Sequence, residues 1–94
     1  MIRSFRGVYT QPFCQGKLVP DFEPFRKLAE KRLRLLEAAT TLQDLFQLQS
    51  AGLEFSEGDA KGKYSLRIVK EWRIFFEWPP GSNGPEKVKI GYGR

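Results

Sequence analysis

The sequence predicts a single α+β domain over residues 1–94, with helices in the first half of the chain and strands in the second. Apolar residues recur at three- and four-residue spacing between residues 25 and 48, which indicates amphipathic helices. From residue 53 onward, short segments of alternating polarity are separated by turn residues, which indicates strands. Thirteen aromatic side chains, eight of them phenylalanine, give a chain of this length enough apolar volume for one core.

The first half is expected to form a short strand at residues 2–5 and a helical turn at residues 9–15 before two longer helices. The first longer helix covers residues 25–39, and the residues before it suit the start of a helix: Asp21, Glu23 and Pro24. Its inner face follows an apolar stripe that one arginine interrupts: Phe25, Leu28, Ala29, Arg32, Leu35, Leu36 and Ala39. The second covers residues 41–48 and turns three side chains inward: Leu42, Leu45 and Phe46.

Four strands are expected after the helices, at residues 53–56, 63–68, 72–78 and 86–92. The middle two form a hairpin, and the length of its loop decides which side chains share a face. A two-residue loop would place an arginine among apolar side chains, at a cost on the order of several kcal/mol for an unpaired charge. We therefore predict a three-residue loop, which puts the apolar residues on one helix-covered face: Tyr64, Leu66, Ile68, Trp72, Ile74, Phe76 and Trp78.

The same register places Arg67 directly opposite Arg73 on the other face, with Lys63 beside them. Two arginines in this position repel each other unless an anion lies between them. The pair therefore predicts an anion site, and the planar guanidinium group suits a phosphate. The alternative is that a neighbouring carboxylate, from Glu71 or Glu77, neutralises each arginine.

The positive charge of the chain lies in its last third. Residues 1–60 contain eight basic and eight acidic side chains, whereas residues 61–94 contain eight basic and three acidic ones, so the net charge of +5 arises there. This distribution suggests a phosphate-rich partner, although basic residues also keep a small domain soluble. The candidate RNA contacts are basic residues of this region and an aromatic residue suited to base stacking: Lys61, Lys70, Phe75, Lys87, Lys89 and Arg94.

The composition also excludes several kinds of site. The chain has no histidine, which removes Ser-His and Cys-His catalysis and most zinc sites, so we expect neither a metal nor a cofactor. Cys14 is the sole cysteine, which rules out an internal disulfide and suits a reducing compartment. No apolar run approaches the roughly 20 residues that span a bilayer, and the N-terminus does not have the pattern of a signal peptide. We therefore expect a cytoplasmic protein that does not contact the membrane.

Several motifs resemble those of a known family. Residues 58–68 read Gly-Asp-Ala-Lys-Gly-Lys-Tyr-Ser-Leu-Arg-Ile, and residues 72–76 read Trp-Arg-Ile-Phe-Phe. Together with the opening Met-Ile-Arg-Ser-Phe and the Leu- and Ala-rich stretch at residues 33–45, they resemble the HigB-type toxins of the RelE/ParE superfamily. These are toxins of bacterial type II toxin–antitoxin systems. The resemblance covers nearly the whole chain, in the same order and spacing.

The resemblance implies a RelE-like fold, in which an antiparallel sheet of four to five strands carries an N-terminal helical hairpin on one face. It implies ribosome-dependent, metal-independent cleavage of mRNA, which blocks translation. It also implies partners: the mRNA, the ribosome and a helix-turn-helix antitoxin of the HigA type. In the family, the arginine of the Trp-Arg motif, here Arg73, lies at the active site.

The C-terminal end departs from the family pattern. Many HigB-type toxins end in Asp-Tyr-His, whose histidine is catalytic, whereas this chain ends in Val-Lys-Ile-Gly-Tyr-Gly-Arg. If the tyrosines are aligned, Gly91 and Gly93 take the positions of Asp and His. An alignment without a gap instead puts Tyr92 at the Asp and Arg94 at the His. The chain is therefore either an enzyme that works with Lys, Arg and Tyr, as RelE does, or an inactive relative that binds RNA, the ribosome or the antitoxin.

Cleavage of RNA by its own 2′-hydroxyl needs a base, cations that hold the phosphate, and an acid for the leaving 5′-oxygen. Arg73 and Arg67 are the candidates for holding the phosphate. Tyr92 is the candidate acid or base, and Lys63 or Lys61 is the alternative base.

Overall fold

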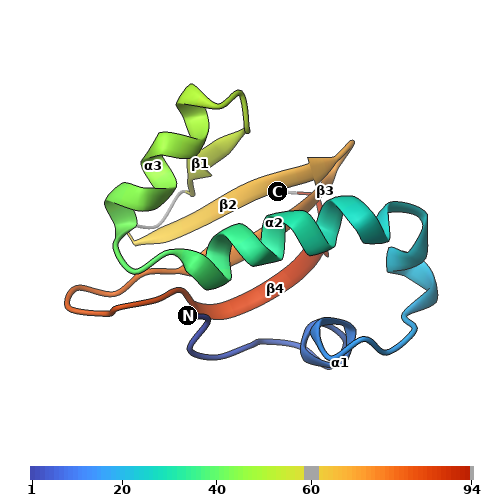
Figure 1. Ribbon diagram of the computed structural model, residues 1–94. Helices are drawn as coiled ribbons and strands as arrows, with labels where there is room; N and C mark the ends of the chain where they lie inside the picture. The colour runs from blue at the N-terminus through green and yellow to red at the C-terminus, as the bar shows by residue number, and fades with distance from the viewer. Residues whose placement is uncertain (59–61, 94) are drawn as a thin grey trace.

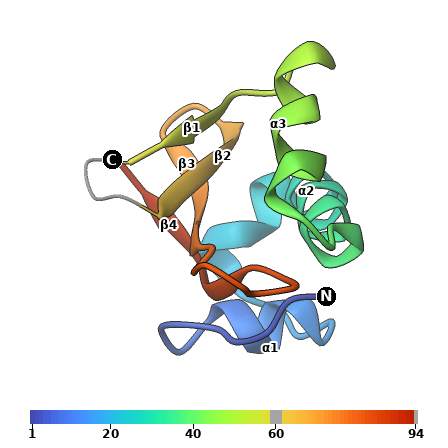
Figure 2. The same cartoon turned by 90° about the vertical axis from the view of Figure 1, so that its left-hand side faces the viewer.

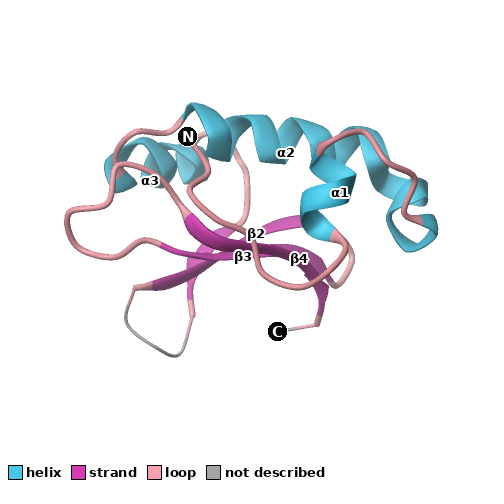
Figure 3. Cartoon of the chain, turned by 90° about the horizontal axis from the view of Figure 1, so that it is seen from below, coloured by secondary structure: helices cyan, strands magenta, loops and turns pink. Residues whose placement is uncertain are grey.

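The computed structural model describes residues 1–58 and 62–93, and it confirms the α+β fold (Figure 1). The helices are α1 (Thr10–Cys14), α2 (Arg26–Ala38) and α3 (Leu42–Ser50), and a 3₁₀ helix (Pro20–Phe25) precedes α2. The strands β1 (Phe55–Glu57), β2 (Lys63–Val69), β3 (Trp72–Glu77) and β4 (Glu86–Tyr92) form one antiparallel sheet in this order. Figure 3 shows the helices on one face of the sheet, so the described residues leave the other face open.

Helix α2 turns a slightly different face inward from the one that the sequence predicted. Ala29, Leu33 and Leu36 are buried along it, spaced by four and three residues. Leu28 and Leu35, predicted to face inward, are instead 37% and 36% exposed. The helix has two adjacent apolar ridges, one of which contains Arg32. The prediction was wrong because the sheet covers the other ridge, that of Ala29, Leu33 and Leu36.

Helix α3 starts at a capping box. The Thr41 hydroxyl accepts the backbone N–H of Asp44 at 3.3 Å, and the Asp44 carboxylate accepts the N–H of Thr41 at 3.2 Å. Backbone hydrogen bonds of this kind hold the pKa of Asp44 below its ordinary value. Leu45 is buried as predicted, whereas Phe46 is 41% exposed and rests edge-on against Phe55 of β1. The inward prediction for Phe46 was therefore wrong, because its ring covers the edge of the sheet.

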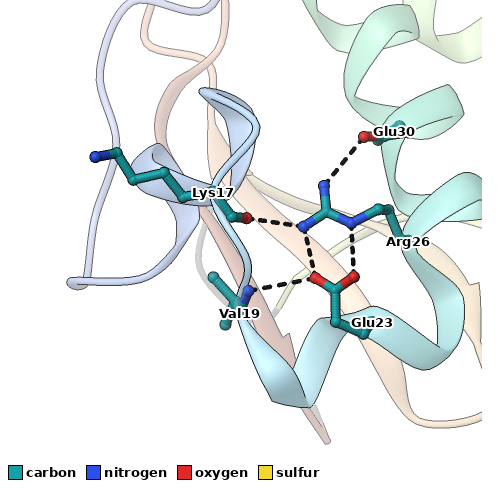
Figure 4. A network of polar contacts seen from close by, with 5 residues as sticks. All are labelled: Lys17, Val19, Glu23, Arg26 and Glu30. Atoms are coloured by element: carbon teal, nitrogen blue, oxygen red, sulfur yellow. Dashed lines mark hydrogen bonds and ion pairs between the residues drawn. The ribbon is translucent and has the colours of Figure 1, made fainter.

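Arg26 joins the start of α2 to the segment that follows α1 (Figure 4). Its guanidinium donates to both carboxylate oxygens of Glu23, to Glu30 at 3.2 Å and to the carbonyl of Lys17 at 2.8 Å. The same group lies 4.5 Å from the centre of the Phe13 ring. The hydrogen bond from Arg26 holds the pKa of Glu23 below its ordinary value. Each of the three guanidinium nitrogens of Arg26 therefore donates a hydrogen bond within the protein.

The hairpin has the predicted register but a different turn. Arg67 is paired with Arg73 as expected, although Val69 is already paired with Trp72, so the chain turns at residues 70–71. A bulge between Arg67 and Val69 supplies the third residue that the register requires. The predicted apolar face is confirmed, because it lies under the helices and all but one of its residues are buried: Tyr64, Leu66, Ile68, Ile74, Phe76 and Trp78, with Trp72 partly buried.

The N-terminal segment runs beside β4, as Figure 2 shows, without forming the predicted strand at residues 2–5. A single parallel bridge joins Phe5 to Val88. The prediction was wrong because the backbone leaves the extended path at Gly7, whose φ is 80°, and α1 begins soon afterwards. The hydroxyl of Thr10 in α1 then accepts the backbone N–H of Ile90 at 3.0 Å. The outer edge of β4 is thus partly covered.

Candidate nucleic-acid interface

The open face of the sheet contains a hollow of about 590 Å³, which we call the basic hollow. Of the described residues, four basic ones line it, three from strands and one from the N-terminal segment: Lys63, Arg73, Lys87 and Arg6. Its other polar and aromatic lining comes from β1, β2 and β3: Ser56, Glu57, Tyr64, Ser65, Phe75, Phe76 and Glu77. Among the described residues, basic side chains outnumber acidic ones in the hollow by four to two. It therefore suits an anionic ligand.

Arg73 stands on β3, in the middle of the open face. Its guanidinium leans along the sheet and donates to the hydroxyl of Ser65 at 3.4 Å, although its cross-strand partner is Arg67. The Ser65 hydroxyl lies 3.2 Å from that of Ser56. Within residues 1–58 and 62–93, Arg73 forms no ion pair. Most of its N–H groups are thus available to a ligand.

Arg67 lies in different surroundings from Arg73. It donates to the carboxylate of Glu54 at 2.8 Å and to the carbonyl of Lys70 at 2.8 Å, and it does not line the basic hollow. The sequence offered Glu71 and Glu77 as neutralising partners, and neither is the residue that the structure uses. The two arginines that were predicted to hold a phosphate together are paired across β2 and β3, but of the two only Arg73 lines the hollow.

The ring of Phe75 lies over Gly91 of β4. A Cβ atom at Gly91 would come within 3.0 Å of a ring carbon, so the missing side chain lets the ring approach the backbone. Phe75 also lines the basic hollow and is partly exposed. A partly exposed ring that rests against the backbone in this way suits stacking of a nucleic-acid base.

Tyr92 does not join the basic hollow. Its ring meets that of Trp72 edge-on, with 5.2 Å between the centroids, and the two residues are paired across β3 and β4. Trp72 belongs to the helix-covered face, where it contacts Phe22 and Phe25. Because side chains alternate along a strand, Tyr92 lies on the other side of the sheet from Arg73. The structure does not bring these two predicted catalytic residues together.

The other predicted RNA contacts are spread over the open face. Lys87 lines the basic hollow, as does Lys63, which was predicted as an alternative catalytic base. The Lys89 side chain instead runs along Gly7, 3.6 Å from where a Cβ atom would lie, and Lys70 belongs to the hairpin turn beside Arg67. Two predictions fall outside the described residues: Lys61 and Arg94.

The sequence reasoning missed three residues of the hollow, Arg6, Ser56 and Glu57. Ser56 could have been found, because a strand at residues 53–56 that pairs across the following turn places it opposite Ser65. Arg6 could not, since the bridge between Phe5 and Val88 joins distant parts of the chain and has no local signal.

The structure offers little support for other chemistry. In the described part of the chain, no three side chains of His, Cys, Asp or Glu are close enough together to hold a metal ion. Desolvation, and next the charge of Glu37, raise the pKa of the Cys14 thiol to about 11, so it stays protonated at neutral pH. None of the described helices is long and apolar enough to cross a membrane.

These features define a small α+β domain with a positively charged site on the uncovered face of its sheet. Residues 15–88 match the family model described as the RelE-like toxin of the type II toxin–antitoxin system HigB. The chain therefore belongs to the HigB-like toxin family. It is also 35% identical, over 51 residues, to Toxin HigB-1 of Vibrio cholerae serotype O1. That alignment covers 54% of this chain and 54% of the relative, so the chain spans about half of the relative's length. The family resemblance drawn from the sequence motifs is confirmed.

Proposed function

We propose that this protein is a toxin that blocks translation by cleaving mRNA on the ribosome without a metal ion. The observation that carries the proposal is the position of Arg73, which presents a guanidinium without an ion-pair partner among the described residues to a basic hollow. The residue also belongs to the Trp-Arg motif through which the chain resembles its family. Because mRNA and ribosomes are its targets, we expect the protein to act in the cytoplasm.

In the proposed reaction, the 2′-oxygen of one nucleotide attacks the adjacent phosphorus atom. Negative charge grows on the two nonbridging oxygens, and Arg73 binds them with two of its N–H groups. The bond to the 5′-oxygen breaks, and that oxygen must receive a proton. Lys63 lines the same hollow and is the proposed donor, because lysine side chains ordinarily carry a proton at neutral pH. The products are a 2′,3′-cyclic phosphate and a 5′-hydroxyl end.

Other residues of the open face would hold the RNA. Phe75 stacks a base next to the bond that is cleaved, while Lys87 and Arg6 contact neighbouring phosphates. Arg67 contributes less, because Glu54 already neutralises it. Lys70 and Lys89 would contact RNA beyond the hollow.

The test is a translation reaction with a defined mRNA, followed by mapping of the RNA ends. The unmodified protein should produce new 5′-hydroxyl ends that depend on active translation, and R73A should not. R34A is the matched control, because it removes the same charge from the exposed side of α2. Equal cleavage by R73A and the unmodified protein would contradict the assignment of Arg73.

We also propose a cognate antitoxin as partner, of the helix-turn-helix HigA type. The support is membership of a toxin family from type II toxin–antitoxin systems. Expression of the chain alone should arrest growth, and co-expression with the neighbouring antitoxin gene should restore growth and yield a stable complex. Normal growth without any antitoxin would argue against toxicity.

A second candidate function is binding of RNA or the ribosome without cleavage. It is favoured by the location of Tyr92, the expected proton-transfer residue, on the other side of the sheet from Arg73. The same translation assay separates the two functions. Ribosome binding that leaves the mRNA intact supports the second candidate, and new 5′-hydroxyl ends support the first.

A further inference from the structure

The proposed cleavage still lacks a base to accept the proton of the 2′-hydroxyl. Lysine and arginine side chains ordinarily carry their proton at neutral pH, and the chain has no histidine. Tyr92 lies outside the basic hollow. Among the described residues, two carboxylates line it, those of Glu57 and Glu77. One of them is therefore the natural place to look for the missing base.

Glu77 is the carboxylate on the same side of the sheet as Arg73. Along β3, the residues at 73, 75 and 77 alternate with the buried residues 74 and 76, so Glu77 shares the open face with Arg73. Its register partner on β2 is Lys63, the proposed proton donor. Glu57 is instead paired with Tyr64, whose side chain belongs to the helix-covered face. Alternation therefore directs Glu57 away from Arg73.

The lean of Arg73 brings the phosphate site close to Glu77. The Arg73 guanidinium donates to Ser65, which is paired with Phe75. The tip of the Arg73 side chain therefore lies at the level of residue 75, two residues further along β3 than its own backbone. Only two more residues, roughly 7 Å of strand, separate that level from the pair of Lys63 and Glu77. A phosphate held there lies within side-chain reach of both residues.

The carboxylate of Glu77 is held by an unusual neighbour. Lys87 has a φ of 52°, a left-handed conformation that is uncommon for a residue with a side chain. It lies at an irregularity in the pairing of β3 and β4, and its backbone N–H donates to the hydroxyl of Ser4 at 2.9 Å. Its Nζ lies 3.9 Å from Oε1 of Glu77. Bulges and strained residues of this kind often aim a side chain at a functional site.

We infer that Glu77 is the general base of the cleavage reaction, an inference that rests on the proposed function. Its carboxylate accepts the proton of the 2′-hydroxyl while the 2′-oxygen forms its bond to phosphorus. The bond from phosphorus to the 5′-oxygen breaks, and the ammonium group of Lys63 gives its proton to that oxygen. Lys87 positions the carboxylate. Exchange with water then returns Glu77 and Lys63 to their starting protonation states.

The first test compares E77Q with the matched control E71Q, which changes an exposed carboxylate at the hairpin turn, outside the hollow. On ribosomes loaded with a defined mRNA, E77Q should lower the single-turnover cleavage rate by about 10²–10⁴-fold. RNA affinity should stay equal or rise, because the variant removes a negative charge beside the RNA. E71Q should cleave at close to the unmodified rate, because Glu71 does not line the hollow. Loss of cleavage without loss of binding is the result expected of a base.

The second test separates the base from the acid with an mRNA that carries sulfur in place of the 5′-oxygen at the cleaved bond. A sulfur leaving group does not need protonation, so K63A should regain most of its rate on this substrate. E77Q should stay slow on it, because the 2′-hydroxyl proton must still be removed. As a further variant, E77A should regain activity when formate is added, and the same concentration of chloride should have no effect.

The outcomes distinguish this inference from the function on which it rests. If the unmodified protein leaves mRNA intact on translating ribosomes, both fail. If it cleaves mRNA and E77Q cleaves equally well, the function stands and the role of Glu77 is wrong. Rescue of E77Q by the sulfur substrate also contradicts it, because that would place Glu77 on the side of the leaving group. A folded E77A that formate does not rescue counts against it as well.

Discussion

Arg26 in the helical layer and Arg73 on the open face of the sheet have very different surroundings. The guanidinium of Arg26 is engaged by two carboxylates and a backbone carbonyl (Figure 4). It also lies over the Phe13 ring. Within the part of the chain that the structure describes, the guanidinium of Arg73 makes one long hydrogen bond, to the hydroxyl of Ser65. An arginine whose donors are all engaged joins segments of the chain, whereas one whose donors are mostly open keeps its charge for a ligand. The contrast separates a residue that holds the fold from one available for function.

Arg67 shows how such a difference arises between two arginines at paired positions. Arg67 on β2 is paired with Arg73 on β3, and both lie on the same face of the sheet. The outer neighbour of Arg67 is β1, whereas that of Arg73 is β4. Glu54, just before β1, reaches Arg67 at 2.8 Å. Arg73 is instead paired on β4 with Gly91, which has no side chain, and it contacts the neutral hydroxyl of Ser65. Whether a carboxylate neutralises each arginine therefore depends on the segment beside the β2–β3 pair, which is β1 for Arg67 and β4 for Arg73.

The largest expected effect comes from removing the two arginines of the open face one at a time. R73A should lower mRNA cleavage by about 10²–10³-fold, the usual loss when one donor to a developing negative charge is removed. R67A should have a much smaller effect, because its charge is already neutralised. Cleavage rates on translating ribosomes measure both, and thermal unfolding should show that R73A is as stable as the unmodified protein. Similar losses for the two variants would show that the arginines act as a pair after all.

The next largest effect is expected on RNA affinity when Phe75 is replaced. Loss of a stacking ring typically costs about 1–3 kcal/mol per base, so F75A should weaken binding of single-stranded RNA by roughly ten- to a hundredfold. G91A sharpens the test, because its methyl group would meet the Phe75 ring at 3.0 Å and shift it without removing it. An RNA titration followed by tryptophan fluorescence measures both variants. If F75A binds RNA with unchanged affinity, Phe75 does not stack on a base.

Changes in the helical layer should affect stability and leave RNA binding alone. The pKa of Glu23 is lowered from an ordinary value of 4.5 by its hydrogen bond to Arg26, so its carboxylate stabilises the folded state above that pH. This contribution is lost as the pH falls below 4.5 and through the lower pKa of the folded state. R26A and E23Q should therefore lower the melting temperature at pH 7, and the difference from the unmodified protein should shrink in acid. Melting curves between pH 3 and 7 test this, with RNA affinity at pH 7 as the control.

The sequence predicted most where one physical effect dominated. Burying Arg73 among apolar residues costs so much that only one hairpin register was acceptable, and that register is present. It predicted less where several arrangements have similar costs. Helix α2 offers two apolar ridges, and only the packed sheet decides that Leu33 is buried and Leu28 is not. The partner of Arg67 and the place of Arg6 depend on contacts between distant segments, which local patterns do not reveal.

The smallest expected effect is that of Y92F, and it tests which side of the sheet carries the chemistry. If Tyr92 moved a proton, its loss would slow cleavage by about 10²–10⁴-fold. The structure instead places its ring against Trp72, on the other side of the sheet from Arg73, so Y92F should cleave at nearly the unmodified rate. The phenylalanine ring can still pack against Trp72, and the variant should therefore keep its melting temperature. A large loss of cleavage with unchanged RNA binding would mean that the last strand rearranges on the ribosome. Tyr92 would then come to the open face, and the placement of all catalytic residues on the side of Arg73 would be wrong.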